Sequence, residues 1–146
     1  MTIRCDIVSQ DRIVFEGDAD IVVIPGSDGV MGILPNHSPV LTTLKYGVIN
    51  VRRKNEQHFF TVAGGVAEVQ PDQVTILADA AEDVEEIDLE RADAARKRAE
   101  ELLANPVKID SDTYLNAQAA LRRSTLRLEA ARKFRHGQSH YRNEES

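Results

Sequence analysis

The chain of 146 residues has no tryptophan, a single cysteine, and few aromatic residues, which make up 5% of it. The lone Cys5 cannot form a disulfide within the chain, which fits a reducing compartment, and it is expected to be a small buried hydrophobe. No run of about 18 apolar residues occurs, so the sequence predicts no membrane-spanning helix. The N-terminus lacks the features of a signal or transit peptide. These absences predict a chain that is neither exported nor imported and meets a membrane only through a partner.

Motifs of common catalytic and metal sites are missing as well. There is no G-x-x-x-x-G-K-[ST] phosphate loop, and the spacing of Gly26, Gly29 and Gly32 does not match the dinucleotide-binding fingerprint. Of the four histidines, only His136 and His140 are close in sequence, without the cysteines or acidic residues that would complete a metal site. The sequence therefore predicts no catalytic residue and no metal ligand, and the three glycines are expected to serve turns.

Charge is unevenly distributed along the chain, whose net charge is −6. Residues 1–84 carry 12 acidic and 6 basic side chains, whereas residues 85–146 carry 12 of each. Within the second part the segment 122–135 is basic, with Glu129 as its one acidic residue. A basic helix suggests an acidic partner, either a protein surface or the phosphates of a nucleotide. The acidic remainder argues against nucleic acid.

The first part of the chain has the pattern of a compact β-domain. Short runs rich in Val and Ile are separated by Gly- and Pro-containing turns, and eight to ten strands are expected in a β-sandwich or barrel. Gly17-Asp18 is interpreted as a break between strands, and the apolar run 21–24 as a strand buried on both faces. Gly64-Gly65 interrupts another run, which predicts a bulge or bend.

The composition changes near Asp79, where Val, Ile, Gly and Pro give way to Ala, Glu, Arg and Leu, which are strong helix formers. Asp88 is a candidate N-cap for a first helix that Asn105-Pro106 would end. Its apolar face comprises Ala92, Ala95, Ala99 and Leu102. A second helix, capped within 110–112, has the stripe Ala117, Leu121, Ser124, Leu128 and Ala131. Because alanine buries little apolar surface, a hairpin of these helices should be marginally stable and prone to open.

These patterns predict an α+β protein in two parts. Residues 1–84 are expected to form an antiparallel β-sandwich, and residues 87–136 an antiparallel two-helix hairpin. Residues 137–146 have low hydrophobicity and no periodicity, which predicts a flexible tail.

Arginines on both predicted helices suggest an anion site. Arg91 and Arg98 share one side of the first helix with Asp88, and Arg123 and Arg127 are i, i+4 neighbours on the second. Guanidinium groups bind phosphate bidentately, so the hairpin could gather them around a nucleotide, with Asp88 accepting from an adenine amine or only capping its helix. Alternatively the arginines face solvent or pair with carboxylates, and spacing alone favours this second interpretation. The nearby carboxylates are Glu82, Glu86 and Glu90.

The stretch Pro25 to Val51, PGSDGVMGILPNHSPVLTTLKYGVINV, closely resembles the epsilon subunit of F-type ATP synthases. The resemblance continues through residues 60–92 and into the predicted helices, although Val30 stands where the family often has an acidic residue. It implies a non-catalytic rotor subunit of a proton-translocating ATP synthase, which joins the gamma subunit to the membrane ring of c subunits. It also implies a place on the cytoplasmic face of the inner membrane, or on the stromal face of the thylakoid.

The resemblance extends to a regulatory nucleotide site. Some bacterial epsilon subunits bind ATP through an [IL]-D-x-x-R-A motif and arginines on both helices, and the segment 87–92, IDLERA, matches that motif. The loop 105–108 departs somewhat from the family. Binding would be regulatory and without hydrolysis, because no phosphate loop or general base is evident. The implied nucleotide-binding residues are Glu82, Ile87, Asp88, Arg91, Ala92, Arg98, Arg123 and Arg127.

Two sets of partner contacts are implied in the same way. The first set belongs to the β-domain and comprises Gly29, Met31, Gly32, Leu34, His37 and Ser38, in loops within Gly29 to Ser38. The second set, Arg122, Arg132 and Arg135, would extend toward the catalytic head of alpha and beta subunits and the acidic loop of beta. That contact would inhibit ATP hydrolysis by blocking rotation, and ATP bound between the folded helices would relieve the block. The alternative is a purely structural coupling subunit that neither inhibits nor binds nucleotide.

Overall fold

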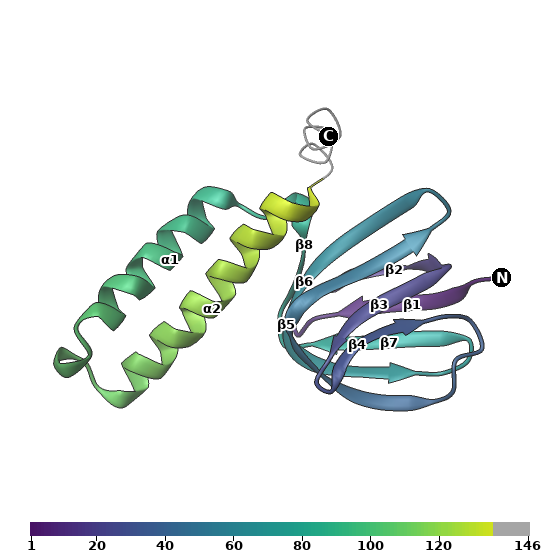
Figure 1. The fold of residues 1–146 in the computed structure, drawn as a ribbon, viewed down its shortest axis with the longest axis horizontal. Coiled ribbons are helices and arrows are strands. Elements are labelled where there is room, and N and C mark those ends of the chain that lie inside the picture. Colours follow the sequence, from purple (N-terminus) through teal and green to yellow (C-terminus); the bar gives the residue numbers. More distant parts are fainter. Residues whose placement is uncertain (136–146) are drawn as a thin grey trace. The chain divides into compact units, whose positions relative to one another are not determined.

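A computed structural model describes residues 1–135 of the chain, which form two compact units (Figure 1). Residues 1–83 form one unit of eight β-strands, and the second unit, from Val84 on, contains two α-helices and two short 3-10 helices. The predicted order of a β-sandwich followed by a two-helix hairpin is confirmed. The predicted tail, residues 137–146, lies outside the described residues.

The strands of the first unit form one continuous hydrogen-bonded sheet in the order β2-β1-β7-β6-β5-β3-β4, with β8 paired to β6 beside this path. Their bounds are β1 (Ile3–Val8), β2 (Ile13–Ala19), β3 (Ile21–Gly26), β4 (Gly29–Ile33), β5 (Val40–Arg53), β6 (Glu56–Val69), β7 (Gln73–Ala78) and β8 (Ala81–Asp83).

Strands β5 and β6, of 14 residues each, belong to both layers of the sandwich. Strand β6 pairs with β8 through Phe60–Val62 and then with β7 through Gly65–Val69. The exchange of partners falls at Gly64-Gly65, where both residues have positive φ. Both strands curve strongly along their length (Figure 1). The bend predicted at these glycines is therefore present, and it lets one sheet fold over a single core.

Several details of the sandwich differ from the prediction. The pairing of β1 with β7 is parallel, whereas an antiparallel sandwich was expected. Gly17-Asp18 does not break a strand, because both residues continue the ladder between β1 and β2. The chain turns instead at Asp20, whose N–H donates to the carbonyl of Arg52 at 2.8 Å. Gly32 lies within β4 and not in a turn.

The core between the layers is aliphatic, with Phe60 as its largest fully buried side chain. Cys5 is fully buried as predicted, and this burial raises the pKa of its thiol to about 12. The run 21–24 is not buried on both faces. Val22 and Ile24 point into the core, whereas Ile21 and Val23 are half-buried, so β3 has the alternation of a strand with one inward face.

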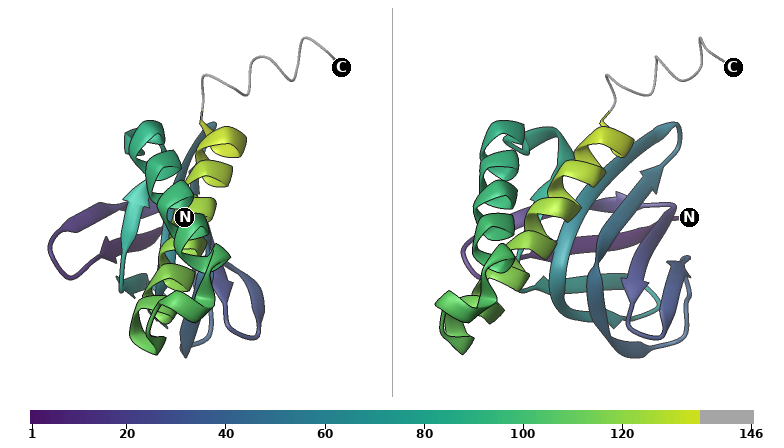
Figure 2. Two further views of the ribbon diagram at one scale, coloured as in Figure 1. Left: turned by 90° about the vertical axis from the view of Figure 1, so that its left-hand side faces the viewer. Right: turned by 60° about the vertical axis from the view of Figure 1, so that its left-hand side comes forward.

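The second unit is an antiparallel pair of α-helices, α1 (Leu89–Ala104) and α2 (Ser111–Phe134), as Figures 1 and 2 show. The 3-10 helix η1 (Val84–Glu86) precedes α1, and η2 (Pro106–Lys108) lies in the connection. The predicted caps are confirmed: Asp88 accepts from the N–H of Arg91 at 3.1 Å, and Asp110 from that of Thr113 at 2.7 Å. Helix α1 ends before Asn105-Pro106, as expected from the restriction that proline places on its predecessor.

Small residues dominate the buried positions of both helices. In α1 these are Ala92 and Ala99, and in α2 they include Ala117, Ser124 and Ala131, so the same spacing of seven recurs on each helix. The predicted stripe on α1 is wrong at Leu102, which is 42% exposed. Small side chains at these positions bury little apolar surface per residue, which predicts a weak association of the two helices.

Replacing Gly65 by alanine should destabilise the sandwich strongly. A Cβ at this position would lie 2.3 Å from the carbonyl oxygen of Leu77 and 2.8 Å from the Cα of Ala78, and its φ of +132° disfavours any side chain. We expect the free energy of unfolding to fall by about 2 kcal/mol or more, measured by urea denaturation. Gly32→Ala is the control, because its nearest contact would be Ile21 Cδ1 at 3.4 Å. Equal stability of the two variants would contradict the close approach at Gly65.

Candidate functional site

The predicted nucleotide-binding motif begins at the N-terminal end of α1. Asp88 occupies the N-cap with an extended backbone, and one of its carboxylate oxygens accepts from the N–H of Arg91. The cap uses one oxygen, and the other remains for a further donor. Asp88 thus caps its helix, which was one of its two predicted roles, and the adenine contact stays a prediction.

Residues of the motif point in two directions. Ile87 is 3% exposed and Ala92 is fully buried, so their side chains offer no surface to a ligand in this conformation. Asp88 and Arg91 are exposed. Ile87 and Ala92 therefore fix the segment in the hairpin, and a ligand would meet the main chain together with the exposed side chains.

The arginines of the two helices fall on the same flank of the hairpin. Arg91 and Arg98 each directly precede a buried alanine of α1, and Arg123 directly precedes the buried Ser124 of α2. Successive residues of a helix are about 100° apart. In two antiparallel helices whose buried positions face each other, residues one step before those positions lie on a common side, as in antiparallel coiled coils. Arg127, three residues after Ser124, lies on that side as well.

The carboxylates of α1 do not neutralise this flank. Asp93 binds Arg96 at 2.7 Å and Lys97 at 3.1 Å, and the hydrogen bond from Lys97 is the main cause that lowers the pKa of Asp93. Arg91, Arg98 and Arg123 are exposed, and no carboxylate within residues 1–135 lies at ion-pair distance from them. The predicted alternative was that the arginines face solvent or pair with nearby glutamates, and in this structure these three side chains face solvent.

Two of the predicted nucleotide-binding residues, Arg127 and Glu82, are half-buried and not exposed. Arg127 is half-buried in α2. Glu82 is half-buried in β8, a strand of the sandwich unit, so it belongs to a different unit from the rest of the set.

The partner contacts predicted in the first unit lie on an edge strand and the turn that follows it. Gly29, Met31 and Gly32 belong to β4, at one end of the sheet order, so this part of the segment is a strand and not the expected loop. Leu34 and Ser38 are exposed, and His37 is held by a 2.7 Å hydrogen bond between its Nδ1 and the carbonyl of Ser38. An edge strand presents backbone groups that a partner can pair with.

An apolar row on the outer face of the sandwich escaped the sequence interpretation. It crosses β2, β1, β7 and β6, whose paired outward residues are Ile13, Val8, Leu77 and Val66. On the fifth strand, β5, Val66 pairs with Thr43, which is polar and hydrogen-bonded to Ser27, and the apolar residue of this face is Leu41. Leu77 is 58% exposed, and Leu41, two residues from Thr43 on β5, is 71% exposed. We call this row, with Leu41, the outer apolar row. The alternation of β7, with Val74, Ile76 and Ala78 buried, was the available signal that Leu77 points outward.

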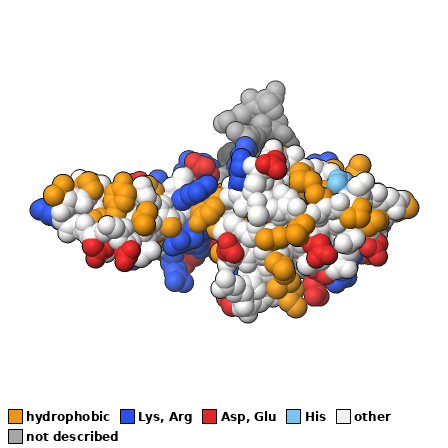
Figure 3. Space-filling view, turned by 90° about the horizontal axis from the view of Figure 1, so that it is seen from below, with side chains coloured by type: hydrophobic (Ala, Val, Ile, Leu, Met, Phe, Trp, Pro, Cys, Tyr) orange, Lys and Arg blue, Asp and Glu red, His pale blue; other side chains and the backbone are white. Residues whose placement is uncertain are grey.

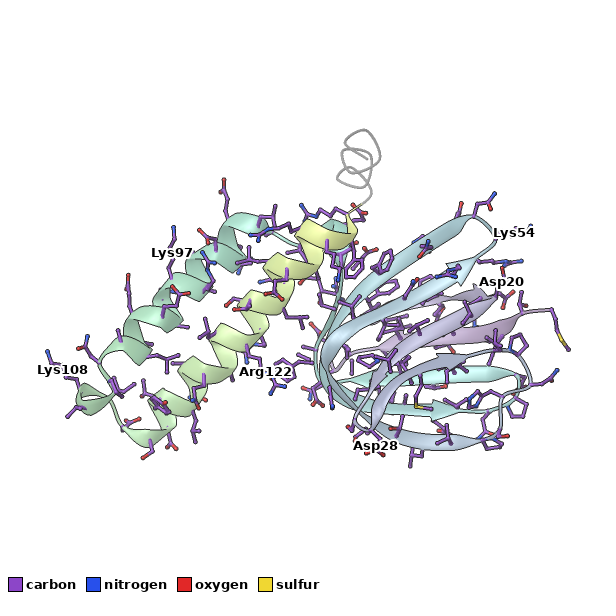
Figure 4. The ribbon with its side chains drawn as sticks, viewed as in Figure 1. Asp20, Asp28, Lys54, Lys97, Lys108 and Arg122 are labelled. Atoms are coloured by element: carbon purple, nitrogen blue, oxygen red, sulfur yellow. The ribbon has the colours of Figure 1, made fainter. Side chains whose placement is uncertain are left out.

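The basic residues predicted to reach a partner differ in how they lie on α2. Arg122 and Arg132 are exposed, and Arg122 projects from the side of α2 that faces away from α1, whereas Lys97 projects from α1 (Figure 4). Arg135 is already engaged within the hairpin, where it donates to the carbonyls of Val84 and Ile87. A partner contact through Nε and Nη2 of Arg135 would require these bonds to break.

The surface of the described residues was also compared with the requirements of metal sites and membrane-spanning helices. Figure 3 shows hydrophobic side chains reaching the surface of both units, and a zone where Lys and Arg side chains gather. Within residues 1–135 no group of His, Cys, Asp or Glu is arranged to hold a metal ion. No helix in that range is long and apolar enough to cross a membrane.

A β-sandwich joined to an α-helical hairpin is the two-domain organisation of the delta and epsilon chains of ATP synthase. The family model for the beta-sandwich domain of the ATP synthase delta/epsilon chain matches residues 2–84, and that for its long alpha-helix domain matches residues 85–132. The chain belongs to this family. It is accordingly a non-catalytic subunit of ATP synthase, as the sequence predicted.

Chains that are similar in sequence or in structure support this assignment. The ATP synthase epsilon chain of Dehalococcoides mccartyi is 43% identical over 136 residues, which cover 91% of this chain and 94% of that one. The ATP synthase epsilon chain of Syntrophobacter fumaroxidans is 47% identical over 131 residues, covering 90% and 96%. A chain in the Euglena gracilis mitochondrial ATP synthase, solved as OSCP/F1/c-ring, superposes with a TM-score of 0.73 at 26% identity, covering 89% and 81%.

The cap of α2 should titrate at low pH. The N–H of Thr113 donates to Asp110 and lowers the pKa of this carboxyl, so the cap contributes stability above the ordinary carboxyl pKa of about 3.9 and is lost as the pH falls through the lowered value. We expect the NMR shift of the Thr113 amide to move with a midpoint below about 3.9. Asp110→Asn keeps an acceptor at the cap and should abolish this transition. A midpoint at or above the ordinary value would contradict the bond.

Proposed function

We propose that this chain is a central-stalk rotor subunit of an F-type ATP synthase, in which residues 1–84 join the gamma subunit to the ring of c subunits. The complex would place it on the cytoplasmic face of the inner membrane, or on the stromal face of the thylakoid. Family membership supports this role, and so does the likeness to a chain of an F1/c-ring assembly. The observation that carries it is the outer apolar row of the sandwich.

A row of exposed apolar side chains across five strands is a feature of interaction surfaces. Burying these side chains against a partner removes apolar surface from water, which is favourable in free energy. Leu77 lies in the middle of the row, with Val8 and Val66 half-buried on either side. We assign this face to the gamma subunit. The edge strand β4 and the turn through Ser38 form a separate surface, which we assign to the c-ring.

Leu77→Ser should weaken binding of the chain to the gamma subunit. Leu77 is exposed, so the sandwich should keep its stability, while the interface loses an apolar contact at its centre. We expect the dissociation constant to rise about fivefold or more, measured by titration of purified gamma subunit. Val107→Ser is the control, since Val107 is 97% exposed in η2 and lies outside this face. Equal affinity of the two variants would remove the outer apolar row from the gamma interface.

The hairpin is proposed to bind ATP on the flank that carries the arginines. Arg91, Arg98 and Arg123 lie on this flank without carboxylate partners among the described residues, so their charges repel one another across a weakly packed pair of helices. A triphosphate between them would replace this repulsion with charge-assisted hydrogen bonds. Its binding would therefore favour the folded hairpin.

The same hairpin is proposed to inhibit ATP hydrolysis when it opens. Helix α2 would then direct Arg122, Arg132 and Arg135 toward the acidic loop of the beta subunit and block rotation. A ligand that binds only the folded form shifts the population away from the inhibitory form by its differential affinity. Such a switch requires two forms of similar energy, and the alanine-rich contact between α1 and α2 provides for this.

Calorimetric titration of ATP into the isolated chain tests the nucleotide site. Saturable binding is expected, and Arg98→Ala and Arg123→Ala should each weaken it about tenfold or more, because each removes a charged donor to phosphate. Lys108→Ala is the control, since Lys108 is a basic residue in the distal connection (Figure 4). Absence of heat up to millimolar ATP would favour the alternative of a purely structural coupling subunit.

A further inference from the structure

Arg135, which follows the last residue of α2, is bound to a segment far away in the sequence. Its Nε donates to the carbonyl of Val84 at 2.9 Å, and its Nη2 donates to the carbonyl of Ile87. The acceptors are 51 and 48 residues away along the chain and lie in η1 and directly before Asp88. These bonds join the end of α2 to the entry of α1, and we call the pair the Arg135 clasp.

The clasp depends on the shape of the guanidinium group. The hydrogens of Nε and Nη2 lie on one edge of the planar group, so a single side chain reaches two carbonyls with a fixed orientation. The N–H of Arg135 also donates to the carbonyl of Ala131 at 3.3 Å, which anchors the residue to the last turn of α2. Its positive charge is favoured at the C-terminal end of a helix. Lysine could supply the charge but not the paired geometry.

The acceptor segment is itself fixed in the hairpin. Val84 is 1% exposed and Ile87 is 3% exposed, so the side chains at both ends of this segment are buried. Asp88, which follows Ile87, caps α1 and opens the predicted nucleotide motif. The clasp therefore determines where the entry of α1, with Asp88, lies relative to the end of α2.

We propose that Arg135 is a positioning residue that keeps the hairpin folded and holds Asp88 in place for the nucleotide; its second role rests on the proposed function above. When α2 separates from the entry of α1, both bonds break together. The clasp is therefore a contact that only the folded form makes, and it biases the equilibrium toward that form. Opening also frees the Nε and Nη2 donors of Arg135 for an acidic partner.

Hydrogen exchange of the full-length chain without nucleotide tests the clasp. In Arg135→Ala, the amides of Arg91 and Ala92 and those of the last turn of α2 should exchange about tenfold faster, because a lost charged hydrogen bond raises the open population. Arg135→Lys keeps the charge and should show most of this effect. Arg132→Ala, an exposed arginine of the same turn, is the control. Faster exchange confined to α2, or equal to that of Arg132→Ala, would overturn the clasp.

ATP titration of the same variants separates the clasp from the nucleotide site. If the wild-type chain binds ATP, Arg135→Ala should weaken binding several-fold while Arg132→Ala does not, and unchanged affinity would overturn the positioning of Asp88. A wild-type chain that binds no ATP contradicts the proposed nucleotide function, while the exchange data still decide whether Arg135 holds the hairpin folded. ATP binding by the wild type together with unchanged exchange in Arg135→Ala contradicts the clasp alone.

Discussion

The sandwich depends on the pairing of two long strands, β5 and β6, with each other. Their ladder runs from Val40 and Val69 at one end to Arg53 and Glu56 at the other, and every other strand of the first unit attaches to it directly or through a neighbour. A straight ladder of this length would produce an open sheet with one face in water. Two residues without side chains, Gly64 and Gly65, permit the bend. Because of this bend, the ladder of β5 and β6 belongs to both layers of the sandwich. The core, the outer apolar row and the edge strand β4 all follow from this bend.

In the hairpin, by contrast, the contact between the two helices is expected to be weak. Alanine and serine at intervals of seven let α1 and α2 approach closely while burying little apolar surface. Hydrogen bonds at the ends therefore carry more weight than they would beside a core of leucines. Asp88 and Asp110 cap the two helices at their starts, and Arg135 ties the end of α2 to the entry of α1. The proposed switch would therefore respond to changes of single polar residues.

Local chemistry determined how much of the structure was predictable from the sequence. The caps at Asp88 and Asp110, the helix end before Pro106 and the bend at Gly64-Gly65 were found because each depends on a residue and its near neighbours. The parallel pairing of β1 with β7 was missed, because it joins residues about 70 positions apart and leaves no local pattern. Leu102 was misplaced for a related reason, since helical spacing identifies a face but not where the partner helix ends.

The candidate site shows the same limit. Arg91, Arg98, Arg123 and Arg127 were identified from their spacing and from family resemblance, and antiparallel packing then places them on one flank. Arg135 had been assigned to a partner surface, because a charge at the end of a helix gives no sign of two carbonyls some 50 residues away. The outer apolar row was missed because it is assembled from five strands that contribute one residue each.

The burial of Cys5 has a practical consequence for observing the proposed opening of the hairpin. The single thiol of the chain lies fully buried in β1 and is protonated at any pH near neutrality. Thiol reagents react with the thiolate, so we expect Cys5 of the folded protein not to react with them. A cysteine introduced on the hairpin would then be the one reactive sulfur of the molecule, and a fluorophore attached there would report on the helices without any change to the native sequence of the sandwich.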